Sequence, residues 1–183
     1  MAIRGARTAL ARLPEFTGRP VRIRFAPELR AYRGQLLSGA DKGAPVHAGS
    51  RLREREIVLE LELLQDPAEL TRILLHELFH FVWLRAANAR RRSYEDLLES
   101  ELGRGARGEL GWSAERRKLA IRPRDRRERS RRWREYACES FCDTAAWVAG
   151  RRRVHDEFTL APRYSEARRR WFEALLDQEE LAW

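Results

Sequence analysis

The feature that most constrains this chain is the run from Asp66 to about Arg85, which is typical of one long helix with a well-marked start. Asp66 can accept hydrogen bonds from the free N–H groups of the first turn. Pro67 suits the first helical position, where its missing N–H costs nothing, and Glu69 completes the capping-box pattern. The stretch "ILLHELFHFVW" (73–83) inside this helix is apolar apart from three residues. Those three residues therefore need an explanation, because polar groups are costly to bury without partners.

The three residues are His76, Glu77 and His80, which form the pattern HExxH. The histidines are four positions apart, so their side chains lie on one helix face about one turn from each other. That spacing lets both imidazoles reach one tetrahedral zinc ion (Zn2+). Glu77, rotated by about 100° from His76, can reach a water at an open position of the metal and act as general base. The competing interpretation is a pair of satisfied core histidines with Glu77 at the rim.

A zinc site of this kind needs at least one more protein ligand, and "CESFCD" (138–143) offers one. This stretch lies in a second predicted helix, from about Arg131 to Gly150. Glu139 and Asp143 are four positions apart on it. We expect Glu139 to bind the metal, and we expect Asp143 to accept a hydrogen bond from the free ring N–H of a ligating histidine.

Other ligand choices remain open at the level of sequence. Glu135 lies one turn before Glu139 on the same face and is an alternative metal ligand. Cys138 and Cys142, with the two histidines, would make a closed Cys2His2 structural site without catalysis. The simpler interpretation of the cysteines is that they are buried, reduced core residues. A hydrolase also needs a group that stabilises the developing oxyanion. The candidates for that role are His155, Tyr136 and Tyr164.

HExxH followed by ExxxD on a later helix resembles the gluzincin branch of the zincin metallopeptidases, as in thermolysin-like enzymes and the CAAX-processing membrane proteases. The resemblance covers these two short motifs and the apolar stretch just before the helix. It implies that His76, His80 and Glu139 hold zinc, that Glu77 is the general base and that Asp143 orients a ligand. It also implies a polypeptide substrate lying along a sheet edge strand, for which "EIVLELEL" (56–63) is in the expected place.

The order of elements along the chain predicts an α+β fold rather than a doubly wound α/β fold, because strand patterns come first and helices follow. We expect a small zincin-like domain over residues 1–183. A mixed sheet of about three to four strands would pack on the active-site helix, and further helices would follow toward the C-terminus. The segment from about 86 to 130 is polar, arginine-rich and dotted with glycine. It is expected to be an irregular insertion with one or two short helices.

Charge is concentrated in this part of the chain. Residues 81–134 hold 17 basic and 8 acidic residues, while the remaining residues are balanced in sign. An acidic partner such as nucleic acid is one explanation, and solvated or internally paired arginines are the other. The alternative function is therefore a non-catalytic protein with structural zinc that binds an acidic partner through residues 85–134. With no membrane-spanning run, no signal-peptide pattern and only two cysteines, the sequence predicts a cytoplasmic protein of unspecified oligomeric state.

Overall fold

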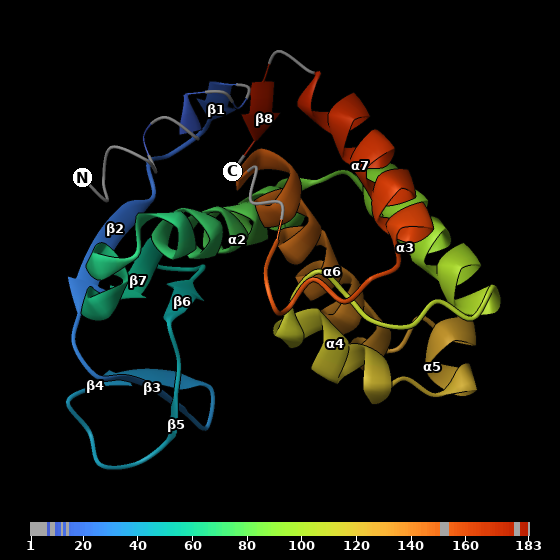
Figure 1. Cartoon of the computed structure of the whole chain (residues 1–183). Coiled ribbons are helices and arrows are strands. Elements are labelled where there is room, and N and C mark those ends of the chain that lie inside the picture. The colour runs from blue at the N-terminus through green and yellow to red at the C-terminus, as the bar shows by residue number, and fades with distance from the viewer. Residues whose placement is uncertain are drawn as a thin grey trace.

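The computed structural model describes residues 7, 10, 11, 13, 15–150, 154–177 and 180–182. Most strands precede residue 61 and the long helices follow it, so the expected α+β class is confirmed. Figure 1 shows helix α2 (Pro67–Arg85) between most of the strands on one side and the remaining helices on the other. The strands are β1 (Glu15–Thr17), β2 (Arg22–Ala26), β3 (Leu29–Tyr32), β4 (Gln35–Ser38), β5 (Ala44–Pro45), β6 (Ala48–Arg51), β7 (Glu56–Glu60) and β8 (Glu180–Ala182).

The sheet that packs against α2 has three strands in the order β2–β7–β6. Strand β2 runs parallel to β7, and β6 runs antiparallel to it, so the sheet is mixed as expected. Ile57 and Leu59 of β7 are fully buried and share one core cluster with Leu74 and Leu78 of α2. A second sheet, in the order β4–β3–β5, is antiparallel, and β1 pairs with β8 in a third.

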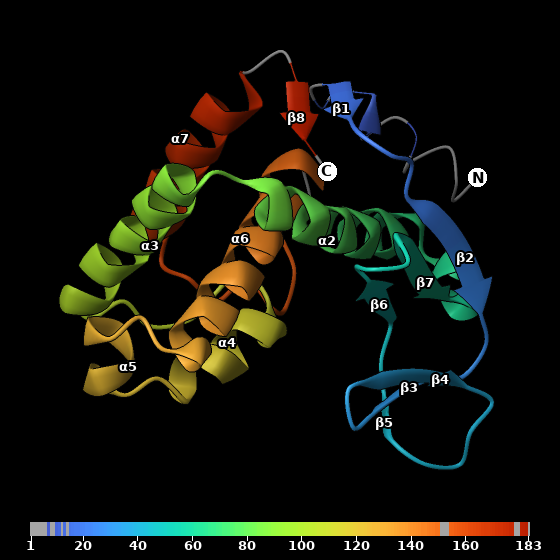
Figure 2. The same ribbon diagram turned by 180° about the vertical axis from the view of Figure 1, so that it is seen from behind.

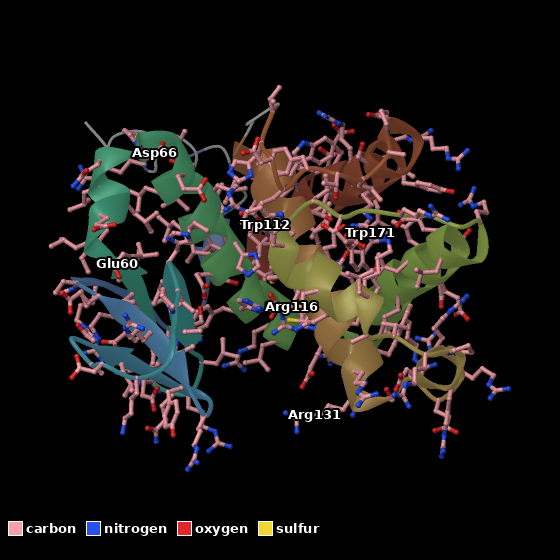
Figure 3. The ribbon with its side chains drawn as sticks, turned by 60° about the horizontal axis from the view of Figure 1, so that its bottom comes forward. Glu60, Asp66, Trp112, Arg116, Arg131 and Trp171 are labelled. Atoms are coloured by element: carbon pink, nitrogen blue, oxygen red, sulfur yellow. The ribbon has the colours of Figure 1, made fainter. Side chains whose placement is uncertain are left out.

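The strand expected over 56–63 differs from the observed one in length and in position. It ends at Glu60, and Leu61–Gln65 form a short 3-10 helix whose first N–H, on Leu61, donates to the Glu60 side chain. Leu61 is consequently 45% exposed instead of facing the core. Strand β7 also lies in the middle of its sheet, so the expectation of an edge strand there is wrong. Glu60 and Asp66, labelled in Figure 3, lie on either side of the turn.

Helix α2 begins and ends where the sequence predicts. Both the Ala68 and the Glu69 N–H groups donate to Asp66 Oδ1 at 3.0 Å, and Pro67 is the first helical residue. Its middle is buried on nearly every side because the β2–β7–β6 sheet covers one face and helix α6 (Arg131–Gly150) crosses the other. Figure 2 shows this crossing from behind.

The basic segment is far more regular than expected. It contains the helices α3 (Asn88–Gly103), α4 (Trp112–Leu119) and α5 (Pro123–Arg127). Tyr94 and Leu98, one turn apart on α3, are fully buried against α6 and against α7 (Pro162–Leu176). The prediction of an irregular insertion is therefore wrong. The many arginines on the outer faces of these helices made the apolar positions that anchor them hard to recognise in the sequence.

A buried ionic network joins the helices of this half. The guanidinium of Arg168 on α7 is fully buried and donates to the carboxylates of Glu101 and Glu109. Lys118 Nζ lies 3.2 Å from Glu109 Oε1, and the Tyr136 hydroxyl donates to the same oxygen at 2.6 Å. Two cations thus face two carboxylates, which keeps the buried charges paired. Among the described residues, no helix is both long enough and apolar enough to cross a membrane.

Candidate metal centre

The crossing of α2 and α6 brings together His76, His80 and Glu139, the three ligands proposed from the sequence. One ligand atom from each side chain lies within 4.8 Å of the others. His76 Nε2 is 3.5 Å from Glu139 Oε2, and the two imidazole ring centroids are 4.9 Å apart. Two ligands of one tetrahedral zinc, each about 2.0–2.2 Å from the metal, would be about 3.4 Å apart. The donor atoms of His76 and Glu139 are therefore already at the separation that such an ion requires, and His80 lies close enough to complete the group.

The orientation of His76 is fixed by Asp143, one turn after Glu139 on α6. His76 Nδ1 lies 2.7 Å from Asp143 Oδ1, so Nε2 is the nitrogen left for a metal. The other carboxylate oxygen, Oδ2, accepts from the Ala114 N–H at 3.2 Å, at the start of α4. A Cβ added to Gly111 would overlap the Asp143 carboxyl group, so only glycine permits this approach. Asp143 thus caps α4 and orients His76 at the same time.

The second histidine is oriented by sulfur. His80 Nδ1 lies 3.4 Å from the Sγ atoms of both Cys138 and Cys142. Its Nε2 is therefore the nitrogen left to face His76 and Glu139. In the part of the chain that the structure describes, the two cysteines converge with His80 but not with His76, so the four side chains do not form one Cys2His2 group.

Glu139 is held by two residues of α4. Its Oε2 accepts from the Ser113 hydroxyl, and its Oε1 lies 3.0 Å from the Arg117 guanidinium. Burial acts to raise the pKa of Glu139, but the hydrogen bond from His76 and the charges of His80, His76 and Arg117 lower it well below its usual range. Glu139 is therefore an anion in the folded protein, as a metal ligand must be.

The surroundings of the histidines favour positive charge. Burial acts to lower the pKa of His76, but the charge and hydrogen bond of Asp143 outweigh it and raise that pKa well above 6.5. The pKa of His80 is also raised despite burial, through its hydrogen bond with Cys138. The hydrogen bond with Cys142 in turn lowers the pKa of the Cys138 thiol to about 6. A site at which buried imidazoles still attract protons suits a divalent cation, which would take the place of those protons.

Glu77 lies beside this cluster, next to strand β6. Its Oε2 accepts from the Ser50 hydroxyl at 2.5 Å, and its backbone carbonyl accepts from the same hydroxyl at 3.2 Å. Glu77 is only 8% exposed. Ser50 therefore joins the sheet to the residue proposed as general base, a contact that the sequence did not indicate.

Three of the alternative residues lie elsewhere. Glu135 is exposed and pairs with Arg131 at 2.7 Å, and Figure 3 shows Arg131 at the start of α6. The Tyr136 hydroxyl is engaged by Glu109 in the buried network. The Tyr164 hydroxyl donates to the Arg104 carbonyl at 3.0 Å, in a separate core cluster. The structure thus gives neither tyrosine an oxyanion role, and it places Glu135 outside the metal cluster.

His155 lies in a polar cluster at the N-terminal half of α2. Its Nε2 is 3.3 Å from Glu69, and its Nδ1 accepts from the Glu157 N–H at 3.2 Å. Arg72, buried on α2, bridges the carboxylates of Glu69 and Glu157. Arg72 precedes His76 by one turn, so the i, i+4 spacing was a signal that could have placed it beside the site. Ser113 and Arg117 had no such signal, because they lie more than 20 residues from Glu139.

No protein-family model, curated protein or solved structure matches this chain.

Proposed function

We propose that this protein is a zinc-dependent metallopeptidase of the zincin type. The observation that supports the proposal most strongly is the convergence of His76, His80 and Glu139 from two crossing helices, with Glu77 beside them and Asp143 behind His76. Two imidazoles and one carboxylate leave an open coordination position, which is the donor set of catalytic zinc sites. When bound, zinc would act as a Lewis acid that lowers the pKa of a water and polarises the carbonyl of the scissile bond.

The residues of this chain have distinct roles in that reaction. His76 and His80 present Nε2 because Asp143 and the thiols engage their Nδ1 atoms. Glu77 accepts the proton of the attacking water and later delivers it to the leaving amine, which is general base and then general acid catalysis. The Ser50 hydroxyl holds the Glu77 carboxylate in place before substrate arrives.

The substrate site proposed here is strand β6. It is one of the two outer strands of the β2–β7–β6 sheet, and its Ser50 contacts Glu77 directly. An extended polypeptide added to this edge would pass the metal cluster with its backbone hydrogen-bonded to residues 48–51. This replaces β7 as the substrate-binding strand. We also propose a cytoplasmic location, because Cys138 and Cys142 are free thiols.

The decisive experiment compares Glu77→Gln with wild-type protein. The variant should keep its zinc, because Glu77 is not a ligand, and should lose cleavage of an unfolded polypeptide by about 100-fold to 10,000-fold. Newly formed amino termini measure the cleavage, and elemental analysis measures the zinc. Glu135→Gln is the matched control, since that exposed carboxylate lies outside the cluster. Undiminished cleavage by Glu77→Gln would show that the role assigned to Glu77 is wrong.

A second candidate function is binding of an anionic partner through the basic segment. Much of this charge is internally paired: among the described residues, Arg129 contacts Glu95 and Asp96, and Arg124 contacts Glu128. One open pocket of about 400 Å³ nevertheless gathers several arginines between α3 and the start of α6. Binding there should weaken steeply with salt. The pocket is lined by Trp83, Asn88, Arg91, Arg92, Glu95, Arg129 and Arg134.

A further inference from the structure

The imidazole of His80 faces different chemistry on its two nitrogens. Nδ1 lies 3.4 Å from each Sγ of Cys138 and Cys142, which leaves Nε2 for the proposed zinc site. The nitrogen and the two sulfurs lie within 4.8 Å of one another. Both thiols are free, and they sit on successive turns of α6, which is packed directly against α2. In the proposed peptidase reaction the two sulfurs serve only to orient His80, so their capacity to bind a metal is not used.

The dimensions of this group are those of a metal site. A cation bound about 2.3 Å from sulfur and about 2.0 Å from nitrogen holds those two atoms about 3.5 Å apart in tetrahedral geometry. The observed separation of 3.4 Å is the same for both sulfurs, so no side chain needs to move far. Two thiolates and one imidazole are soft donors, which select thiophilic cations such as Cu+, Cd2+ or Zn2+ over Mg2+ or Ca2+.

We propose that His80, Cys138 and Cys142 form a second metal site, specific for thiophilic cations, which competes with the HExxH site for His80. A neutral imidazole has one lone pair, because its other nitrogen carries the proton. When the lone pair is on Nε2, the Nδ1–H donates toward the thiols and His80 serves the HExxH site. When a soft cation takes Nδ1, Nε2 carries the proton and is lost to that site. The competition rests on the proposed function, whereas the sulfur site itself does not.

Replacement of zinc by a thiophilic cation requires only proton transfers and ligand exchange, with no redox step. Two Cys sulfurs bind as thiolates, so up to two thiol protons leave to solvent as the cation arrives. The proton on Nδ1 of His80 moves to Nε2, and the cation takes the lone pair that this exposes. The HExxH site keeps His76 and Glu139, but it has lost one of its three protein ligands. Thiophilic cations would therefore switch off the peptidase by displacing its zinc, without touching Glu77.

The test is a Cd2+ titration of zinc-loaded, reduced wild-type protein, followed by two signals. The ultraviolet charge-transfer absorption of cadmium–thiolate bonds reports the sulfur site, and a chromogenic chelator reports released zinc. We expect both signals to rise together and to saturate with one Cd2+ per chain. The pair Cys138→Ser and Cys142→Ser should abolish the absorption and should weaken Cd2+-driven zinc release by more than about 100-fold. Circular dichroism confirms that each variant is folded.

Two single variants separate this proposal from the proposed function. His76→Ala removes a ligand of the HExxH site only, so the cadmium–thiolate absorption should persist with an affinity at least as high as in zinc-loaded wild-type protein. His80→Gln should weaken it. If wild-type protein holds no zinc but still binds Cd2+ through both thiols and His80, the proposed function and the competition fail and the sulfur site stands. The absence of the absorption in folded wild-type protein would overturn the sulfur site. Its persistence at full affinity in His80→Gln would overturn the role of His80.

Discussion

The contact between Gly111 and Asp143 gives a sharp test of how the site is built. Gly111 has φ −178°, an extended conformation that any residue can adopt, so the backbone itself does not demand glycine. What demands it is space, because a Cβ there would overlap the Asp143 carboxyl group. Gly111→Ala should therefore push Asp143 away from both of its partners, the ring of His76 and the N–H of Ala114.

The size of the effect follows from those two contacts. Loss of a hydrogen bond that orients a metal-bound histidine typically weakens metal binding about 10-fold to 100-fold. That corresponds to about 1.4–2.8 kcal/mol of zinc-binding free energy. Loss of the cap at the start of α4 adds about 1 kcal/mol to the destabilisation of the metal-free protein. A carboxylate that is 3% exposed cannot find water in exchange, so these values are lower bounds.

The assay is competition for zinc between the protein and a chromophoric chelator, combined with denaturant unfolding of the metal-free protein. Gly103→Ala is the matched control, because Gly103 ends α3 in the same basic segment and a Cβ there meets nothing within 4 Å. It should leave zinc affinity unchanged and alter the free energy of unfolding by at most about 1 kcal/mol. If Gly111→Ala binds zinc as tightly as Gly103→Ala, Asp143 does not orient the metal site as argued.

Two further predictions concern protons and buried charge. Zinc affinity should keep rising with pH above 6.5, because the raised pKa of His76 keeps the metal-free imidazole protonated there and zinc must displace that proton. In the metal-free protein, the raised pKa of His76 stabilises the fold fully below pH 6.5, and this stabilisation is lost as the pH rises through the raised pKa. Chelator competition at several pH values measures the zinc affinity, and unfolding curves measure the stability. A zinc affinity that levels off at pH 6.5 would contradict the prediction. Arg168→Met should cost about 3–5 kcal/mol in the free energy of unfolding, because Glu101 then loses the Arg168 cation and Glu109 keeps only Lys118. The exposed Arg170→Met on the same helix should change it by less than about 0.5 kcal/mol, and an equal loss in both variants would argue against the network.

The parts of the fold that could be predicted are those set by residues close together in the sequence. Asp66 and Pro67 set the start of α2, and the residues that begin and end α6 were also identified from the sequence. The strand before α2 was overextended because Leu61 and Leu63 continue its alternation, while Glu60 already caps a 3-10 turn. Its place in the middle of the sheet depends on β2 and β6, and their pairing order is not a local property.

The residues of the candidate site also fall into a group that the sequence could predict and a group that it could not. His76, Glu77 and His80 form one local motif, and Glu139 with Asp143 forms another, so the sequence identified both. Their supports come from distant segments: Ser50 from β6 and Ser113 from α4. Hydroxyl groups of this kind have no periodic pattern, and only the folded arrangement shows which carboxylate each one reaches.

The cap that Asp143 provides for α4 has a consequence for shortening the chain. The segment 86–130 looks like an insertion that a protein engineer would remove to obtain a smaller domain. Yet α4 supplies the N–H that engages Asp143, together with the two side chains that hold Glu139. A trimmed chain would keep every residue of both sequence motifs and would still lose the groups that hold two of them in place. The smallest unit that keeps this cluster intact therefore includes α4 as well as the two motifs.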